Sequence, residues 1–175
     1  MQPPNRKEPP LTITQSQTQA INDLRTVGLA RYAAMKSAEK AYADAQERER
    51  LACQYAAEHG EFFTEDGKRV TGEYDSFLMD EQKFATEFVP LITAGYKVLF
   101  GLDYPVGYTP VFEQYLDPLN KARRSYRQIA ADYLRILGRE QEAQKIERAL
   151  NTYVHPKYME ELDRINRQFL GIQED

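Results

Sequence analysis

A run of about forty residues without a proline constrains the fold of this chain more than any other feature. It extends from Thr14 to His59, and Gly28 is the only glycine inside it. Proline and glycine are the residues that most disfavour the interior of a helix, so this run predicts one continuous helix. At 1.5 Å per residue the helix is roughly 60 Å long, which exceeds what a domain of this size needs. We therefore expect it to bind a second helix along its length.

The side chains of this run predict both where the helix starts and which face it buries. Thr14 with Gln17, or Ser16 with Gln19, has the spacing of a capping pair at a helix N-terminus. We call the apolar and small residues that recur every three or four positions, apart from one step across Glu49, the seam. The seam consists of Leu24, Gly28, Tyr32, Met35, Ala38, Tyr42, Ala45, Ala52 and Ala56.

Alanine supplies much of the seam, and small side chains let a neighbouring helix approach closely. The spacing is that of a coiled coil, which predicts a tightly packed antiparallel partner, in the same chain or in another one. The seam residues that we expect to contact a partner are Ala38, Tyr42 and Ala45.

The chain divides into three parts around this helix. Residues 1–13 hold four of the nine prolines, so we expect an extended, proline-rich arm. Residues 14–60 form the long helix, and residues 61–175 complete a single domain with a hairpin and a helical bundle. The hairpin is predicted at 62–74, where two β-prone runs flank Asp66-Gly67.

Prolines, glycines and capping residues divide the rest of the chain into helices. The expected helices run from a cap at Asp75 or Ser76 to Gly101 with a kink at Pro90, then over 110–116, 118–137, 139–154 and 157–170. Their short connections favour antiparallel neighbours. The fold class that follows is all-α, an antiparallel helical bundle with one long N-terminal helix and a small β-hairpin insertion.

One stretch of the C-terminal third has a known repeat pattern. The segment RSYRQIAADYLRILG ends at Gly138 and is followed by Glu142, Ala143 and Ala149-Leu150, with Pro156 beyond. Over about 33 residues this stretch resembles a tetratricopeptide repeat, which implies a helix-turn-helix unit with small residues where its helices cross. Solenoids need about three such units, and the sequence contains no second copy. The resemblance therefore indicates a helical hairpin.

Charge is unevenly distributed along the chain. The net charge of −4 argues against a dedicated nucleic-acid binder, whose affinity depends on neutralised phosphates. Residues 61–87 hold eight acidic and three basic side chains, whereas residues 121–139 hold six basic side chains and one acid. The two regions can dock on each other or on neighbouring copies, or both can be solvated helix faces.

Two further groups of residues are candidates for binding a partner. The basic region contains Arg123, Arg124 and Arg127, whose guanidinium groups can bind carboxylates of a protein partner or phosphates. Tyr126, between them, is expected to lie in the core. Tyr104 and Tyr108 lie in the loop at 102–110, and tyrosine is favoured at interfaces.

The sequence offers no pattern typical of catalysis, of cofactor binding or of a metal site. Its two histidines, His59 and His155, lack the spacing of zinc ligands, and Cys53 is the only cysteine and is expected to be buried. No apolar run is long enough to span a bilayer and no secretion signal is found, so we expect a cytoplasmic protein.

These observations favour a non-enzymatic structural or adaptor protein. It would act through helix-mediated protein–protein contacts in a larger assembly, by self-association or with another protein. The alternative is a nucleic-acid or phosphate-binding accessory protein that uses the arginine-rich helix at 121–139. An enzyme whose site is assembled from scattered acids and tyrosines is a third possibility.

Overall fold

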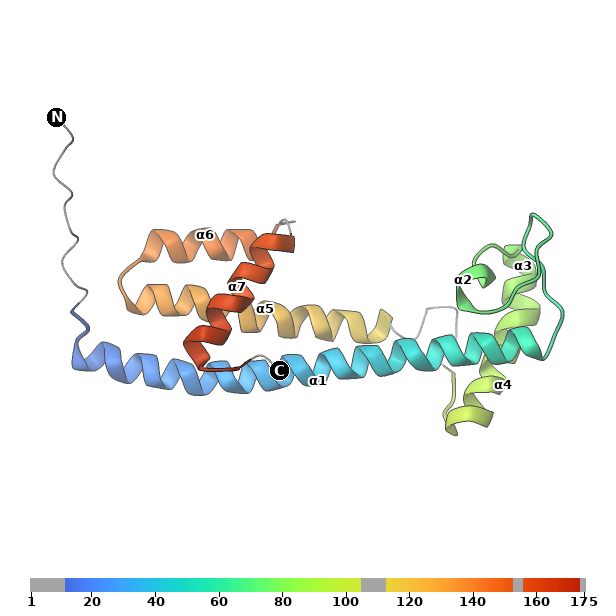
Figure 1. Cartoon of the computed structure of the whole chain (residues 1–175), viewed down its shortest axis with the longest axis horizontal. Coiled ribbons are helices and arrows are strands. Elements are labelled where there is room, and N and C mark those ends of the chain that lie inside the picture. The colour runs from blue at the N-terminus through green and yellow to red at the C-terminus, as the bar shows by residue number, and fades with distance from the viewer. Residues whose placement is uncertain (1–11, 105–112, 153–155, 174–175) are drawn as a thin grey trace, which may run out of the picture. The chain divides into compact units, whose positions relative to one another are not determined.

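The structure is a computed structural model, and it describes residues 12–104, 113–152 and 156–173. Within these ranges the chain is helical and forms no β-strand (Figure 1), which confirms the all-α class. The helices are α1 (Gln15–Glu58), α2 (Glu73–Ser76), α3 (Glu81–Lys83), a π-helical turn (Phe84–Phe88), α4 (Val89–Phe100), α5 (Glu113–Ile136), α6 (Glu140–Leu150) and α7 (Pro156–Leu170). The proline-rich arm, apart from its last two residues, lies outside the described ranges.

The contacts within the chain group it into two compact units. Unit 1 consists of residues 1–33 and 123–175, and unit 2 consists of residues 34–122. Both α1 and α5 therefore contribute residues to each unit.

The long helix predicted from the absence of proline is confirmed as α1. Its N-terminus is closed by the first of the two capping pairs considered. The backbone N–H of Gln17 donates to Thr14 Oγ1 at 3.1 Å, and the backbone N–H of Thr14 donates to Gln17 Oε1 at 2.9 Å. Two of the amides that a helix start leaves without partners are satisfied in this way.

The seam of α1 faces inward, because each of its residues is buried or half-buried. Helices of the same chain pack on it. A side-chain carbon added to Gly28 would lie 2.6 Å from Leu170 Cδ2 of α7, within unit 1. In unit 2, Tyr55 of α1 packs so closely on α4 that a carbon added to Gly95 would lie 2.9 Å from Tyr55 Cδ1. Gly28 of the seam thus permits a close approach by α7, and Gly95 of α4 permits one beside the seam, at Tyr55.

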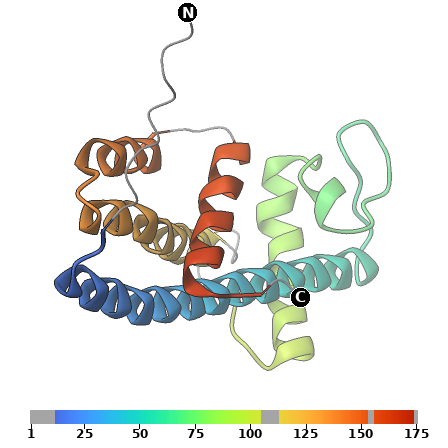
Figure 2. The same cartoon turned by 60° about the vertical axis from the view of Figure 1, so that its left-hand side comes forward.

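In unit 1, α6 runs back beside α5, and α7 crosses them (Figure 1 and Figure 2). Gly138 ends α5 in the left-handed conformation with φ +77°, and the N–H of Arg139 donates to the carbonyl of Leu134 at 2.9 Å. This pattern of bonds is typical of a helix that stops at a glycine. The helical hairpin indicated by the repeat-like segment is therefore present, with alanines 130, 131 and 143 in the core where its helices meet.

The β-hairpin expected at 62–74 is not formed. The chain does reverse direction at Asp66-Gly67, but it makes only isolated antiparallel bridges, from Phe63 to Arg69 and from Thr64 to Met79. Side chains compete for the backbone groups that would extend a ladder: the N–H groups of residues 71 and 72 donate to the Asp75 carboxylate at 2.8 and 2.9 Å. Local bonds of this kind favour turns over strands.

Two expected helix starts also need correction. Asp80, rather than Asp75 or Ser76, caps the helix that leads into α4, since its Oδ1 accepts the backbone N–H of Lys83 at 3.0 Å. The helix break expected at Pro118 is absent, because α5 continues through this proline. A proline inside a helix costs one backbone hydrogen bond, which a long helix packed on a core can lose without ending. Pro90, in contrast, lies at the start of α4, directly after a π-helical turn. The helix is therefore irregular just before Pro90, where a kink was predicted.

Candidate functional site

The predicted partner residues of the seam differ in their burial. Ala45 is fully buried, and Ala38 and Tyr42 are half-buried. Ala45 is therefore inaccessible to a separate helix, whereas Ala38 and Tyr42 keep part of their surface. Glu49, which interrupts the spacing of the seam, lies on the same face of α1 and is itself buried. The buried face therefore continues through this position with a carboxylate in place of an apolar residue.

Tyr104 lies in the core of unit 2 rather than on its surface. Its hydroxyl donates to Glu49 Oε1 at 3.0 Å, and its ring centroid lies 5.0 Å from that of Tyr96. A buried carboxylate needs a hydrogen-bond donor, and Tyr104 supplies one. The interruption of the seam by a glutamate was the sequence signal for this contact. Tyr108 lies outside the described residues.

Two groups beside Glu49 have raised pKa values. Burial, followed by the nearby charge of Glu49, raises the pKa of Tyr96 to about 12. The same two causes raise the pKa of the Cys53 thiol. Both groups therefore stay protonated near neutral pH, where neither acts as a base or a nucleophile.

Arginines of the basic region are bound to carboxylates of their own unit. Arg127 of α5 donates two hydrogen bonds to Asp163 of α7, at 2.9 and 3.0 Å. Arg135 donates to Glu140 at 2.7 Å and to Glu147, both on α6. Arg139 forms an ion pair with Glu142 of α6 over a distance of 2.5 Å. The contacts of Arg127 and Arg135 join α5 to α7 and to α6, whereas that of Arg139 is local to the start of α6. Together they offset much of the charge that a phosphate would need.

The other two arginines predicted to bind a partner lie at the boundary of unit 1. Arg124 is exposed and Arg123 is half-buried. Tyr126, expected in the core, is fully buried and packs on Tyr32 with ring centroids 5.5 Å apart. The structure thus separates the basic helix into an inner apolar face and an outer face of mostly paired arginines.

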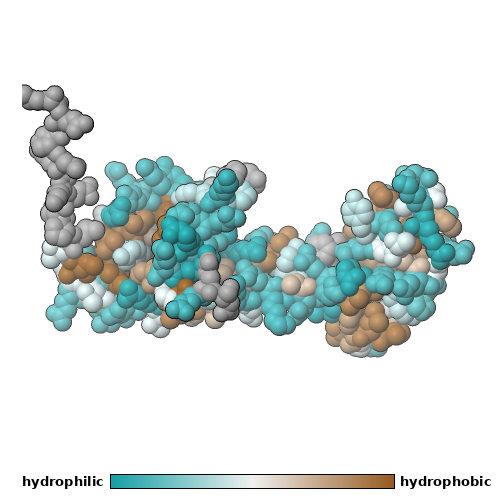
Figure 3. All heavy atoms as spheres, viewed as in Figure 1, coloured by the Kyte–Doolittle hydropathy of each residue, from teal (hydrophilic) through white to brown (hydrophobic). Residues whose placement is uncertain are grey.

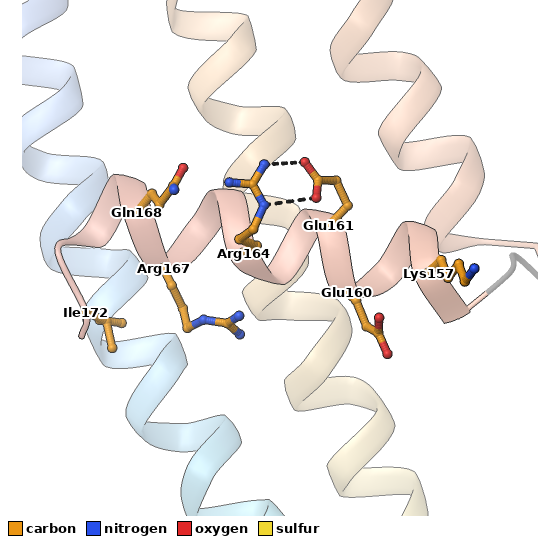
Figure 4. A pocket seen from close by; sticks show the side chains of 7 residues that line it. All are labelled: Lys157, Glu160, Glu161, Arg164, Arg167, Gln168 and Ile172. Atoms are coloured by element: carbon orange, nitrogen blue, oxygen red, sulfur yellow. Dashed lines mark hydrogen bonds and ion pairs between the residues drawn. The ribbon is translucent and has the colours of Figure 1, made fainter. Parts of the chain in front are cut away.

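A hollow on α7 is lined by charged and polar side chains (Figure 4): Lys157, Glu160, Glu161, Arg164, Arg167, Gln168 and Ile172. All of them lie on α7 or directly after it, and Arg164 is paired with Glu161. The hollow is one polar face of a helix and not a space enclosed by several elements. Its mixture of charges favours neither anions nor cations.

Among the described residues, no three histidine, cysteine or acidic side chains are grouped closely enough to hold a metal ion. The same part of the chain has no helix that is both long and apolar enough to cross a membrane.

The C-terminal end of α4 is the surface that needs a further explanation. Ile92, Tyr96 and Leu99 follow one another at spacings of four and three on one face of the helix. Ile92 and Tyr96 are buried, but Leu99 is 46% exposed, together with Val98 at 68% and Leu102 at 47%. We call Val98, Leu99 and Leu102 the α4-end patch. The inward face of α4 thus continues past the core of unit 2, where the described residues leave it exposed.

The figures show why this patch is exposed. The C-terminal half of α4 extends beyond α1 in both views (Figure 1 and Figure 2), on the side of α1 opposite α2 and α3. Apolar residues gather there on the surface (Figure 3). Gly101, with φ +67°, ends the helix, so Leu102 lies next to the last turn. Contiguous apolar surface of this kind is typical of interaction sites.

One pair of opposite charges lies beside the α4-end patch. Lys97 precedes it and Asp103 follows it, and their Nζ and Oδ1 atoms lie 3.4 Å apart. Both side chains are exposed. The patch is therefore an apolar surface with one cation and one anion at equal distances along the chain from Phe100.

No known protein family, no curated protein and no solved structure is significantly similar to this chain.

Proposed function

We propose that this protein is a non-enzymatic structural or adaptor protein that self-associates through the α4-end patch. The observation that carries the proposal is the exposure of Leu99, on the same helix face as the buried Ile92 and Tyr96. A leucine on the inward face of a helix gains stability only when something covers it. A second copy of the chain supplies that cover.

The order of residues around Phe100 supports a second copy as the partner. In a two-fold symmetric contact, two copies of one surface meet in opposite directions. If residue i of the first copy faces residue j of the second, residue j of the first copy also faces residue i of the second. When two chains cross near Phe100, Lys97 faces Asp103 of the partner copy, and Val98 faces Leu102. Apolar side chains meet at the centre, and the Lys97 and Asp103 side chains, which pair within one copy when it is alone, exchange partners between the two copies.

The expected strength of this contact follows from the area left exposed. Burying a valine or leucine completely contributes about 1.5–3 kcal/mol, and the three side chains of the patch are about half exposed. Six of them in a dimer contribute roughly 6 kcal/mol. The loss of translational and rotational freedom opposes this with about 4–15 kcal/mol. The patch alone therefore does not outweigh this cost by enough to hold a dimer at ordinary concentrations. The proposed dimer needs the opposite-charge contacts and further surface beside the patch.

The long α1 fits this role as a scaffold. In the proposal, the helices of each unit pack on α1 as antiparallel neighbours and fill its seam, so contacts with other copies come from surfaces that the packing leaves open.

Sedimentation equilibrium over a wide range of protein concentrations tests the proposal. We expect the average mass of the unaltered protein to rise with concentration, and that of the Val98→Ser/Leu99→Ser variant to remain at the monomer value. Both side chains are exposed, so the fold of the variant is expected to survive, which circular dichroism checks. The matched control is Val27→Ser/Leu29→Ser on α1, where the side chains are similarly exposed, at 42% and 47%.

The proposal is wrong if the unaltered protein stays monomeric at every concentration, or if both double variants change its assembly equally. In the second case the apolar surface of the chain would associate without specificity.

A further inference from the structure

A groove in unit 2 lies on the other side of α1 from the α4-end patch. Two adjoining hollows of about 330 and 370 Å³ share Phe77, Met79 and Glu81 in their walls, and so form one continuous groove. Met79 and Ser76 are buried at its base, whereas Phe77 and Leu78 are 56% and 54% exposed. We call this the acidic groove.

The segment between α2 and α3 owes its shape to local hydrogen bonds. Asp75 accepts two backbone N–H groups before α2, and Asp80 caps α3, so the chain between them is held in a turn. The turn presents Phe77 and Leu78 outward instead of burying them. Apolar side chains presented by a fixed turn are already arranged for binding, since little ordering is needed when a partner arrives.

The charged side chains described along the groove are all acidic. Glu65 and Asp66 lie at one end of it, and Glu81 lies between the two hollows. The hydrogen bond from Thr64 lowers the pKa of Asp66, and the exposed Lys68 lies 3.7 Å from this carboxylate and offsets part of its charge. Unit 2 as a whole carries sixteen acidic and nine basic side chains, so its wider field has the same sign.

We infer that the acidic groove binds a positively charged amphipathic segment of another protein. An apolar side chain of that segment packs on Phe77 and Met79, and lysine or arginine side chains on either side pair with the carboxylates. An amphipathic helix in a groove is a recurrent form of peptide recognition. Phosphates of nucleic acids and of anionic membranes are repelled by the same carboxylates.

The basic helix of this chain is a weaker fit for the groove. Three of its six cations, Arg127, Arg135 and Arg139, already pair with carboxylates of unit 1. Of the other three, Lys121 and Arg124 are exposed. A segment of a different protein can bring more cations than these two, and we therefore commit to a different protein as the source.

Selection from a library of random peptides displayed on phage tests the inference, with the immobilised full-length chain as bait. Selections run in parallel on the unaltered protein and on the Phe77→Ser variant, in which an exposed side chain is replaced. We expect the peptides that only the unaltered protein retains to carry a net positive charge and spaced apolar residues.

The affinity of one such synthetic peptide is then measured by fluorescence anisotropy. Phe77→Ser is expected to weaken it by roughly tenfold or more, as the loss of a central anchor does. The reversal Glu81→Lys is expected to weaken it too, and the affinity for the unaltered protein should fall as salt is added. The matched control, Val27→Ser/Leu29→Ser on α1, replaces exposed side chains outside both proposed surfaces and is expected to leave the affinity unchanged.

Three results would overturn the inference. The first is that no peptide depends on Phe77, or that the dependent peptides are neutral or acidic. The second is that a lysine homopolymer without apolar residues binds as well as the selected peptide, which would show attraction by charge alone. The third is that Phe77→Ser lowers the average mass of the protein measured alone, which would identify a second copy as the occupant. The self-association proposed above is measured separately, so either idea can fail while the other stands.

Discussion

The ion pair between Arg127 of α5 and Asp163 of α7 provides a test of what the basic helix does. We predict that it stabilises unit 1, since two hydrogen bonds of 2.9 and 3.0 Å join the two side chains. Both are mostly shielded from water, with side-chain exposures of 22% and 21%. If Arg127 served only a partner or a phosphate, its removal would change binding but not the stability of the isolated protein.

The size of the effect follows from the burial and the geometry. Exposed ion pairs contribute about 0–1 kcal/mol, whereas hydrogen bonds to charged groups contribute about 1.5–3 kcal/mol. Breaking a fully buried pair costs about 3–5 kcal/mol, which is an upper limit here. We therefore expect a coupling free energy of about 2 kcal/mol between the two side chains. For a chain of this length, a loss of that size lowers Tm by about 4–8 °C.

A double-mutant cycle measures this coupling, with Arg127→Met, Asp163→Asn and the double variant followed by denaturant unfolding. The pair Arg164–Glu161 on α7 is the control, because both of its side chains are about half exposed. Its coupling is expected to be indistinguishable from zero. A coupling free energy at Arg127–Asp163 no larger than that of the control would refute the reasoning. Arg127 would then be a candidate for binding a partner instead of a stabilising residue.

Three further predictions concern buried groups. Burial, and after it the charge of Asp163, raises the pKa of Tyr126 to about 12. The contribution of the protonated Tyr126 to the free energy of unfolding is therefore fully present below pH 10 and is lost between pH 10 and pH 12. Tyr126→Phe should reduce this alkaline loss of stability, measured by urea unfolding. Its hydroxyl has no hydrogen-bond partner among the described residues, so Tyr126→Phe is expected to be neutral or stabilising at pH 7. Cys53 should react with a thiol reagent only when unit 2 opens, because burial raises its pKa, and labelling at the same rate in native and unfolded protein would contradict this. In thermal unfolding, Gly95→Ala is expected to lower the free energy of unfolding by up to about 2 kcal/mol, since the new carbon meets three atoms of Tyr55 at 2.9–3.2 Å. Gly28→Ala should lower it less, because the new carbon meets only the movable end of a leucine side chain.

The sequence was most informative where a single residue type decides the backbone. The absence of proline predicted α1, and the glycines at 138 and 171 predicted where α5 and α7 end, since both adopt a left-handed conformation. The capping pair of Thr14 and Gln17 follows from local hydrogen bonding alone. Tyr126 was expected in the core from the spacing of apolar residues and is buried there.

The sequence was less informative where several local structures compete. The turn signal at Asp66-Gly67 was correct, yet Asp75 takes the backbone amides that a hairpin ladder would need. Tyr104 looked like a surface tyrosine because the buried carboxylate that it serves lies 55 residues away along the chain. The α4-end patch could not be predicted, because its apolar residues resemble core residues until the packing leaves them exposed.

The central claim, that two copies meet at the ends of their α4 helices, is tested most directly by charge complementation. Lys97→Asp places an acid opposite Asp103 of a second copy, and Asp103→Lys places a base opposite Lys97, so each variant repels itself. A mixture of the two restores both opposite-charge contacts. The measurement is the average mass, by sedimentation equilibrium at low salt, of each variant alone and of their equimolar mixture. We predict that each variant alone is more monomeric than the unaltered protein and that the mixture regains the dimer. A mixture with no more dimer than its two components would contradict the account.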